Sequence, residues 1–468
     1  MTDDPSVEDP PMGSPDVAPV EPRDNSLGDL PADPARLGPD VVEGTLRLRA
    51  AQLAAERRRR DDLWSRGFTR RRFLAGAGMA GVAGLGAQLA TARASFGTAP
   101  GAGTLVVVFL RGGMDGLSVL VPADDPHLPA ARPKIGVPAG ALLPLTRGFG
   151  LHPSLTPLHN LWKLGAFTAV PAVSTPDVSR SHFQAQDCLE RGGSGTGTNE
   201  GWLDRVLDAL GPGTTFRAVG SGATVPRALA GDQRALAVDR LERFRLRGGE
   251  EVHPQTIEAV RALYTGLDHP IAQDVATTLE ALDIARLVVA ADLRPAATYP
   301  EGQFATRLAE VARLIKAGIG LRVACIDVGG WDMHTNLGTV ESGAMTHQLT
   351  VLGEAFGAFT SDLGDHLADV TVVAMTEFGR RVQQNANAGT DHGHGAVVLL
   401  MGGGLAAGTV QGAWHGLAPD GLDRGDVPGW NDYRDVLGEV ITRRLGVGAG
   451  DLGTVFPGHR VQPLGVMA

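Results

Sequence analysis

Five apolar segments of the chain have the length and composition of buried β-strands. The first, residues 104–110 (TLVVVFL), is a continuous apolar run, which is typical of a strand covered on both faces in a parallel sheet. The others are residues 166–173, 321–327, 369–375 and 395–401. A long segment with helical periodicity, residues 344–367, separates two of them and can serve as a crossover. The pattern predicts an α/β fold with a mostly parallel central sheet flanked by helices.

One large α/β domain is expected over residues 101–468. Inside it, residues 254–267, 272–292 and 303–317 have helical periodicity with no strand signal between them. These segments predict an all-helical insertion over about residues 254–317.

Charge and cysteine content exclude several classes of protein. The chain has 42 Lys and Arg against 52 Asp and Glu, a net charge of −10. It has no basic stripe interleaved with aromatic residues, so no nucleic-acid partner is expected. Two cysteines, Cys188 and Cys325, are too few for a disulfide framework or a thiolate zinc site. We expect two small buried side chains in preference to a bridge.

The first part of the chain has the composition of a disordered tail. Residues 1–40 contain ten acidic residues and few large apolar side chains, so they cannot bury enough surface to fold. A basic segment follows. We therefore expect a disordered acidic tail and a basic segment over residues 1–68.

Residues 69–94 have the order of parts found in an export leader. Arg70 and Arg71 precede Phe73, a Gly/Ala-rich run and a small-residue site that ends at Ala94. This is the layout of a cleaved signal peptide, and it resembles a twin-arginine signal. Five glycines make the run poorly suited to a permanent membrane span. We expect the twin-arginine translocation machinery as a partner, and an extracellular, cell-wall or periplasmic location.

Ionisable residues stand at the ends of the expected strands. In open α/β sheets, ligands collect at the carboxyl edge of the strands. Carboxylates and imidazoles that converge there are the ligand set expected for zinc, manganese or another divalent cation. The residues at or near strand ends are Asp115, Asp327, Asp332, His334, Glu377, Asp391, His392 and His394.

Each of these signals also has a purely structural interpretation. Asp115 lies between glycines and is compatible with a turn. Asp391 and His392 are compatible with a solvated loop pair, and Glu377 with a salt bridge to Arg380. Their joint position at strand ends favours a functional cleft.

A hydroxyl residue opens the segment after the second strand. Ser181 precedes an amphipathic stretch, residues 182–191, which predicts a helix with a hydroxyl cap.

Five short motifs together resemble the domain of unknown function 1501 family. The resemblance extends over about residues 101–445, and the family is placed in the alkaline-phosphatase-like superfamily with sulfatases and cofactor-independent phosphomutases. The motifs are LRGGMDG (110–116), RSHF (180–183), GWDMHTN (330–336), TEFGR (376–380) and GTDHG (389–393).

The resemblance implies roles for the site residues. Ser181 would be the nucleophilic hydroxyl at a helix start, with His182 beside it, and Asp115 would be a metal ligand. Asp327 or Asp332, together with His334, would form a second ligand pair.

The remaining ligands admit two alignments. In the first, Asp391 and His392 form an Asp-His pair, with His394 or His415 as the last ligand. In the second, which the strand spacing favours, Glu377 replaces the Asp, Phe378 stands where an imidazole is expected, and His392 is only a later loop ligand. The second alignment implies one metal site or a weakened pair.

Two functions follow from the resemblance. The first is an exported hydrolase, dependent on a divalent metal (zinc or manganese), of phosphate or related esters, with a small-molecule or cell-surface ester as substrate. A sulfatase with an oxidised nucleophile is not expected, because Cys188 is not followed by proline. The alternative is an exported non-catalytic binding or structural protein that keeps a degraded site of this kind.

Overall fold

The computed structural model describes residues 103–193, 199–244, 254–266, 270–291 and 293–468. The chain divides into two units, residues 1–85 and 86–468, and all of the described residues lie in the second. The predicted tail, basic segment and signal peptide lie outside the described residues. Within the described ranges, no helix combines the length and the apolar character needed to cross a membrane.

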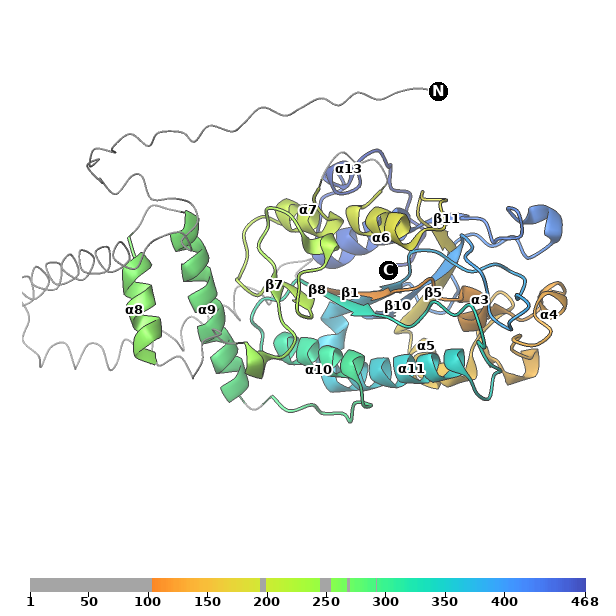
Figure 1. Ribbon diagram of the computed structural model, residues 1–468, viewed down its shortest axis with the longest axis horizontal. Coiled ribbons are helices and arrows are strands. Elements are labelled where there is room, and N and C mark those ends of the chain that lie inside the picture. Colours follow the sequence, from red (N-terminus) through yellow and green to blue (C-terminus); the bar gives the residue numbers. More distant parts are fainter. Residues whose placement is uncertain (1–102, 194–198, 245–253, 267–269, 292) are drawn as a thin grey trace, which may run out of the picture. The chain divides into compact units, whose positions relative to one another are not determined.

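An eight-stranded sheet forms the centre of the second unit (Figure 1). Its strand order is β11-β5-β10-β9-β1-β8-β6-β7. The strands are β1 (Thr104–Leu110), β5 (Phe167–Ser174), β6 (Ala218–Ser221), β7 (Leu236–Ala237), β8 (Val323–Val328), β9 (Val370–Met375), β10 (Ala396–Gly402) and β11 (Asn431–Asp432).

All five predicted strands are confirmed, with ends that differ by at most two residues. β1 pairs in parallel with β8 and β9, and β6 pairs in parallel with β8 and β7. β10 is antiparallel to both of its neighbours, β9 and β5. The sheet is therefore mostly parallel, as predicted.

Two helical layers cover the sheet. α6 (His182–Arg191) and α7 (Trp202–Ala209) lie on one face, and α5 (Thr156–Lys163), α10 (Gln303–Lys316) and α11 (Ala344–Leu363) on the other (Figure 1). Side chains of a strand point alternately to the two faces. Accordingly, Val106 and Val108 of β1 belong to the core that contains α10 and α11. Leu105 and Val107 belong to the core that contains α7 and α12 (Tyr433–Val440).

The predicted insertion is not confirmed as one helical unit. Helices are present where expected, as α8 (Pro254–Tyr264), α9 (Pro270–Ala290) and α10. However, α10 packs against α11 and β8 as part of the layer that covers the sheet. Only α8 and α9 share a separate small core, around Ile257, Leu279 and Leu282.

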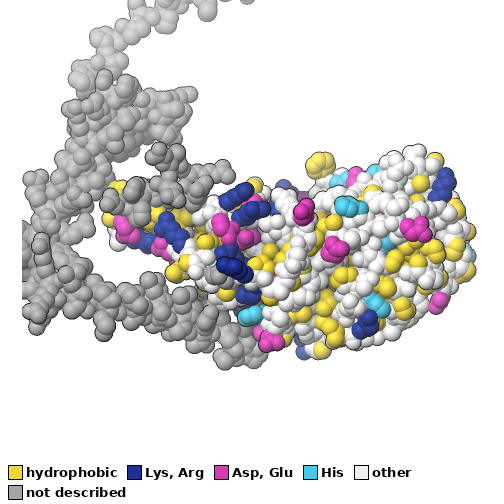
Figure 2. Space-filling model, turned by 90° about the horizontal axis from the view of Figure 1, so that it is seen from below, with side chains coloured by type: hydrophobic (Ala, Val, Ile, Leu, Met, Phe, Trp, Pro, Cys, Tyr) yellow, Lys and Arg dark blue, Asp and Glu magenta, His cyan; other side chains and the backbone are white. Residues whose placement is uncertain are grey.

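The face formed by α10 and α11 has a mixed surface, with hydrophobic side chains among charged ones of both signs (Figure 2). Arg313 of α10 is paired with Glu242, and in the separate pair of helices Arg261 of α8 is paired with Asp283 of α9. Partly exposed pairs of this kind contribute about 0–1 kcal/mol each.

Both cysteines are free and buried, as expected.

Candidate metal centre

Four chain segments meet at one edge of the sheet because of the strand directions. Phe109 of β1 is paired with Asp327 of β8 and Met375 of β9, so these three parallel strands end at the same level. β10 runs the opposite way, and its first residue, Ala396, is paired with Val173 near the end of β5. The segment before β10 therefore reaches the edge at which the parallel strands end.

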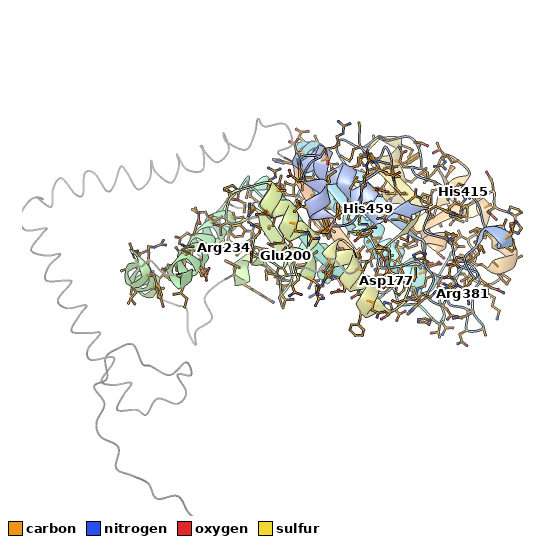
Figure 3. The ribbon with its side chains drawn as sticks, turned by 90° about the horizontal axis from the view of Figure 1, so that it is seen from above. Asp177, Glu200, Arg234, Arg381, His415 and His459 are labelled. Carbon is orange, nitrogen blue, oxygen red and sulfur yellow. The ribbon has the colours of Figure 1, made fainter. Side chains whose placement is uncertain are left out.

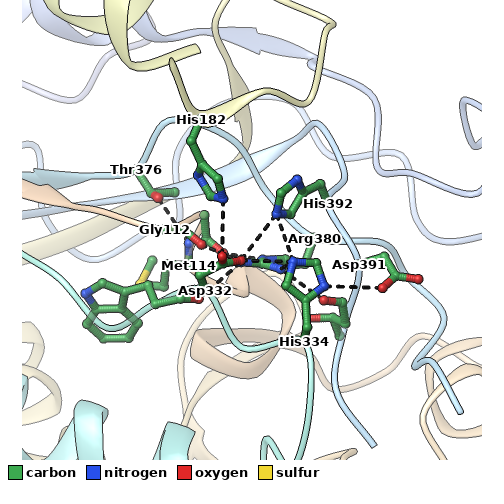
Figure 4. A network of polar contacts seen from close by, with 12 residues as sticks. Gly112, Met114, His182, Asp332, His334, Thr376, Arg380, Asp391 and His392 are labelled. Carbon is green, nitrogen blue, oxygen red and sulfur yellow. Dashed lines mark hydrogen bonds and ion pairs between the residues drawn. The ribbon is translucent and has the colours of Figure 1, made fainter. Parts of the chain in front are cut away.

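Asp332 is the centre of a polar network at this edge (Figure 4). Its Oδ1 lies 2.6 Å from Nη2 of Arg380, 3.0 Å from Nε2 of His334 and 3.2 Å from Nε2 of His392. Its Oδ2 lies 3.4 Å from Nε2 of His182. Burial opposes ionisation, but the Arg380 guanidinium at 2.6 Å outweighs it and lowers the pKa of Asp332 to about 2. The carboxylate is therefore charged at neutral pH.

Three imidazole rings direct the same nitrogen, Nε2, towards Asp332. The Nδ1 atom of each ring faces an acceptor: Oε1 of Glu377 at 2.8 Å from His182, the Arg180 carbonyl at 2.9 Å from His392, and Oδ1 of Asp391 at 3.4 Å from His334. A proton on Nδ1 leaves the Nε2 lone pair free, which is the usual arrangement of histidine ligands of metals.

Two further observations fit a bound cation. The Nε2 atom of His182 is buried and has no hydrogen-bond partner among the described residues. One ligand atom each of His182, Asp332 and His392 lie within 4.8 Å of one another. Burial, the largest effect, lowers the pKa of His392 despite its hydrogen bonds, so its ring is neutral at pH 7 and able to coordinate. Imidazoles with one carboxylate suit zinc or manganese.

Glu377 stands two residues after the end of β9, as predicted, and its carboxylate is enclosed by donors. Oε1 accepts hydrogen bonds from the Gly112 amide and the Gln186 side chain, each at 2.9 Å, and contacts His182. Oε2 accepts from the Thr376 hydroxyl at 3.0 Å. Burial opposes ionisation, yet these bonds keep the pKa of Glu377 below its usual value. In this geometry Glu377 orients His182.

Arg380 is fully buried beside Asp332. Its guanidinium donates to the carbonyls of Gly112, Gly113 and Thr390 as well as to Asp332. The salt bridge to Arg380, which was the purely structural interpretation of Glu377, is not among the ion pairs of the described residues, where Arg380 is paired with Asp332. This buried guanidinium places a permanent positive charge next to Asp332.

Two predicted ligands are paired elsewhere. Asp115 is buried, and both of its oxygens are bonded to the Arg132 guanidinium, at 2.5 and 2.8 Å. Asp327 is paired with Arg111 at 2.8 Å. Neither carboxylate is part of the group around Asp332, and each is paired with an arginine of its own.

Two predicted histidines also lie outside that group. Nε2 of His394 is 3.3 Å from the Thr175 carbonyl. The His415 ring packs edge to face on Trp430, with centroids 4.9 Å apart. Figure 3 shows His415 on the side of the domain seen from above.

The helix predicted over residues 182–191 is confirmed as α6. Ser181 is its N-cap residue, but the prediction of a hydroxyl cap is wrong: the Ser181 side chain makes no cap hydrogen bond. Gln186, one turn after His182, reaches the same Glu377 oxygen. The i, i+4 spacing on a helix that starts with His182 was the signal for this contact.

The fold and site together define an α/β protein with a histidine-carboxylate cluster at the carboxyl edge of its sheet. The model of a family described as "Protein of unknown function (DUF1501)" matches residues 162–425. This is more than half of the 468 residues, and the chain belongs to this family. No curated protein matches the chain.

One solved structure with some similarity is a PsFucS1 sulfatase from Pseudoalteromonas sp.. It is 12% identical, with 77% of this chain and 70% of that chain covered, and the TM-score is 0.34. A similarity of this size carries no conclusion about activity.

Proposed function

We propose that this protein is a metal-dependent hydrolase of phosphate or related esters. The observation that carries the proposal is the convergence of three imidazole Nε2 atoms, from His182, His334 and His392, on the ionised carboxylate of Asp332. Without a bound ion, the Nε2 lone pairs would face a carboxylate whose negative charge is offset by Arg380 alone.

His182, His392 and Asp332 would hold the cation, with His334 as a fourth ligand. When bound, a zinc or manganese ion would polarise the ester and stabilise the negative charge that develops in the transition state. The groups that face the Nδ1 atoms of the three rings support this assignment. Glu377 would orient His182, the Arg180 carbonyl would orient His392, and Asp391 would orient His334.

The centre is proposed to hold one cation. Arg380 already donates to Asp332, and Glu377 accepts from Gly112, Gln186 and Thr376. These carboxylates have little capacity left for a second ion. A single site is one of the two outcomes, a single site or a weakened pair, that the alignment with Glu377 at the end of β9 implies.

Ser181 is proposed as the nucleophile. It is adjacent to His182, and its hydroxyl makes no cap hydrogen bond with α6, so the hydroxyl is available for another role. The N–H groups at the start of α6 would favour an anionic ester group next to Ser181.

Hydrolysis of p-nitrophenyl phosphate and p-nitrophenyl sulfate, with and without added zinc or manganese, tests the proposal. Metal-dependent release of p-nitrophenol that is lost in Asp332→Asn would support the hydrolase. Stoichiometric metal without turnover of either ester would favour the non-catalytic binding protein. Export by the twin-arginine route remains part of the proposal and rests on residues 69–94.

A further inference from the structure

Asp426 is a buried carboxylate in the loop between β10 and β11 that joins two site-forming segments. Its Oδ2 is bonded to the Arg180 guanidinium, and its Oδ1 lies 3.4 Å from Nε of Arg381. The Asp426 side chain is 1% exposed, whereas those of Arg180 and Arg381 are 31% and 39% exposed. Burial raises the pKa of Asp426, and the two guanidinium groups offset part of that effect.

The first segment that Asp426 holds contains Arg180, whose backbone is in the left-handed region with φ of 58°. This conformation is uncommon for a residue with a Cβ and requires support from its surroundings. The Arg180 carbonyl accepts the hydrogen bond from Nδ1 of His392 at 2.9 Å. The conformation that the ion pair supports therefore fixes the acceptor that orients His392.

The second segment contains Arg381 and lies against the other side of His392. Arg380 forms an isolated β-bridge with His392, and Arg381 forms one with Asp426. The Arg381 amide donates to the Asp391 carbonyl at 3.0 Å. Asp426 thus contacts Arg180, whose carbonyl holds the His392 ring. It also contacts the segment of Arg380 and Arg381, which is bridged to the His392 backbone.

We propose that Asp426 is a positioning residue for the metal centre: through Arg180 and Arg381 it holds His392 with Nε2 directed at the cation. This inference rests on the proposed metal centre. Groups that contact a ligand directly typically change metal affinity by about 10–100-fold when they are replaced, and Asp426 acts on one of them, because its Arg180 partner provides the carbonyl that His392 contacts.

The test is zinc affinity, measured by competition with a chromophoric chelator. Asp426→Asn and Arg180→Gln are each expected to weaken zinc binding by about 10–100-fold. Because both substitutions remove the Asp426–Arg180 ion pair, zinc binding by the double variant should be little weaker than by the single variant with the larger loss. Asp423→Asn is the matched control, since Asp423 is half exposed and pairs only with the adjacent Arg424 in side-chain ion pairs of the described structure. Its affinity should equal that of the wild type.

A second measurement separates positioning from general destabilisation. In the metal-free protein, nitrogen NMR of the His392 ring should show the Nδ1–H form in the wild type and a mixture of tautomers in Asp426→Asn. Thermal unfolding of each variant verifies that it is folded at the assay temperature. Should Asp426→Asn not fold, Arg180→Gln, which removes a partly exposed side chain, provides the same test.

The outcomes are distinguishable. Wild-type protein that binds no zinc would overturn the metal centre, and the NMR result would still show whether Asp426 orients His392. Zinc binding by the wild type and equally by both single variants, with an unchanged His392 tautomer, would overturn the role of Asp426 alone.

Discussion

The Nε2 atoms of His334 and His392 lie 3.0 Å apart, and both are within 3.2 Å of the same oxygen of Asp332. Two imidazole nitrogens at this distance require a proton or a cation between them, because two lone pairs would repel. The Nδ1 atom of each ring already faces an acceptor, Asp391 or the Arg180 carbonyl. Nη1 of Arg380 lies 3.4 Å from Nε2 of His334, and Nη2 of Arg380 is bonded to Asp332. A divalent cation would provide a partner for the remaining Nε2 lone pairs.

Ser181→Ala should abolish ester hydrolysis and leave stability nearly unchanged. The Ser181 hydroxyl makes no cap hydrogen bond, so the usual loss of about 1 kcal/mol for a removed cap does not apply. We expect a change of no more than about 0.5 kcal/mol in the free energy of unfolding. Turnover of p-nitrophenyl phosphate and urea unfolding are the measurements. A fully active variant would show that Ser181 is not the nucleophile.

Asp115→Asn should destabilise the protein without changing its metal content. The Asp115 carboxylate binds the buried Arg132 guanidinium through both oxygens, and its neutral replacement leaves that charge uncompensated. Loss of one partner of a buried ion pair typically costs about 3–5 kcal/mol. Chemical denaturation and elemental analysis are measured on the same preparation. Reduced metal with unchanged stability would instead make Asp115 a ligand.

The sequence predicted the long strands of the central sheet better than its short strands. The five apolar runs were found because buried strands have a strong local signature. β7 and β11 have two residues each, and they were missed because strands this short depend on their neighbours and not on their own composition.

The residues of the candidate site were predicted from the sequence, but the partners of its charged residues were not. His182, Asp332, His334 and His392 stand next to recognisable strand or helix ends, whereas the partner of a charged residue is decided only by the folded chain. Nothing local in the sequence indicates that Asp115 pairs with Arg132, or that Asp426 pairs with Arg180.

Acid should destabilise the protein partly through His152, a buried residue remote from the candidate centre in sequence. Burial lowers the pKa of His152 from 6.5 to about 4, so between these values the unfolded chain binds the proton and the folded protein does not. The contribution of neutral His152 to the free energy of unfolding is therefore fully present above pH 6.5. It decreases as the pH falls to 4, by up to about 3 kcal/mol.

The control for this prediction is His152→Asn, which keeps an acceptor for the Ser154 amide and removes the titration. Denaturation midpoints are measured between pH 4 and 7. The decrease in stability towards pH 4 should be smaller in His152→Asn than in the wild type. Parallel curves for the two proteins would contradict the assignment.

Replacement of both Arg70 and Arg71 by lysine should retain the protein in the cytoplasm. The change keeps the charge but removes the planar guanidinium donors that a receptor specific for arginine would recognise. Cell fractionation, with sequencing of the mature N-terminus, is the measurement. Undiminished export of the double variant, or a mature N-terminus far from Ser95, would contradict a twin-arginine signal.

Elemental analysis of the purified protein, wild type and Asp332→Asn, tests the central claim most directly. The account predicts about one equivalent of zinc or manganese in the wild type, loss of that metal in Asp332→Asn, and a lower melting temperature of the wild type after chelation. Asp327→Asn is the matched control, because Asp327 is paired with Arg111, and it should keep its metal. A wild-type protein that carries no stoichiometric metal, even after incubation with both ions, and whose melting temperature is unmoved by chelator would contradict the account.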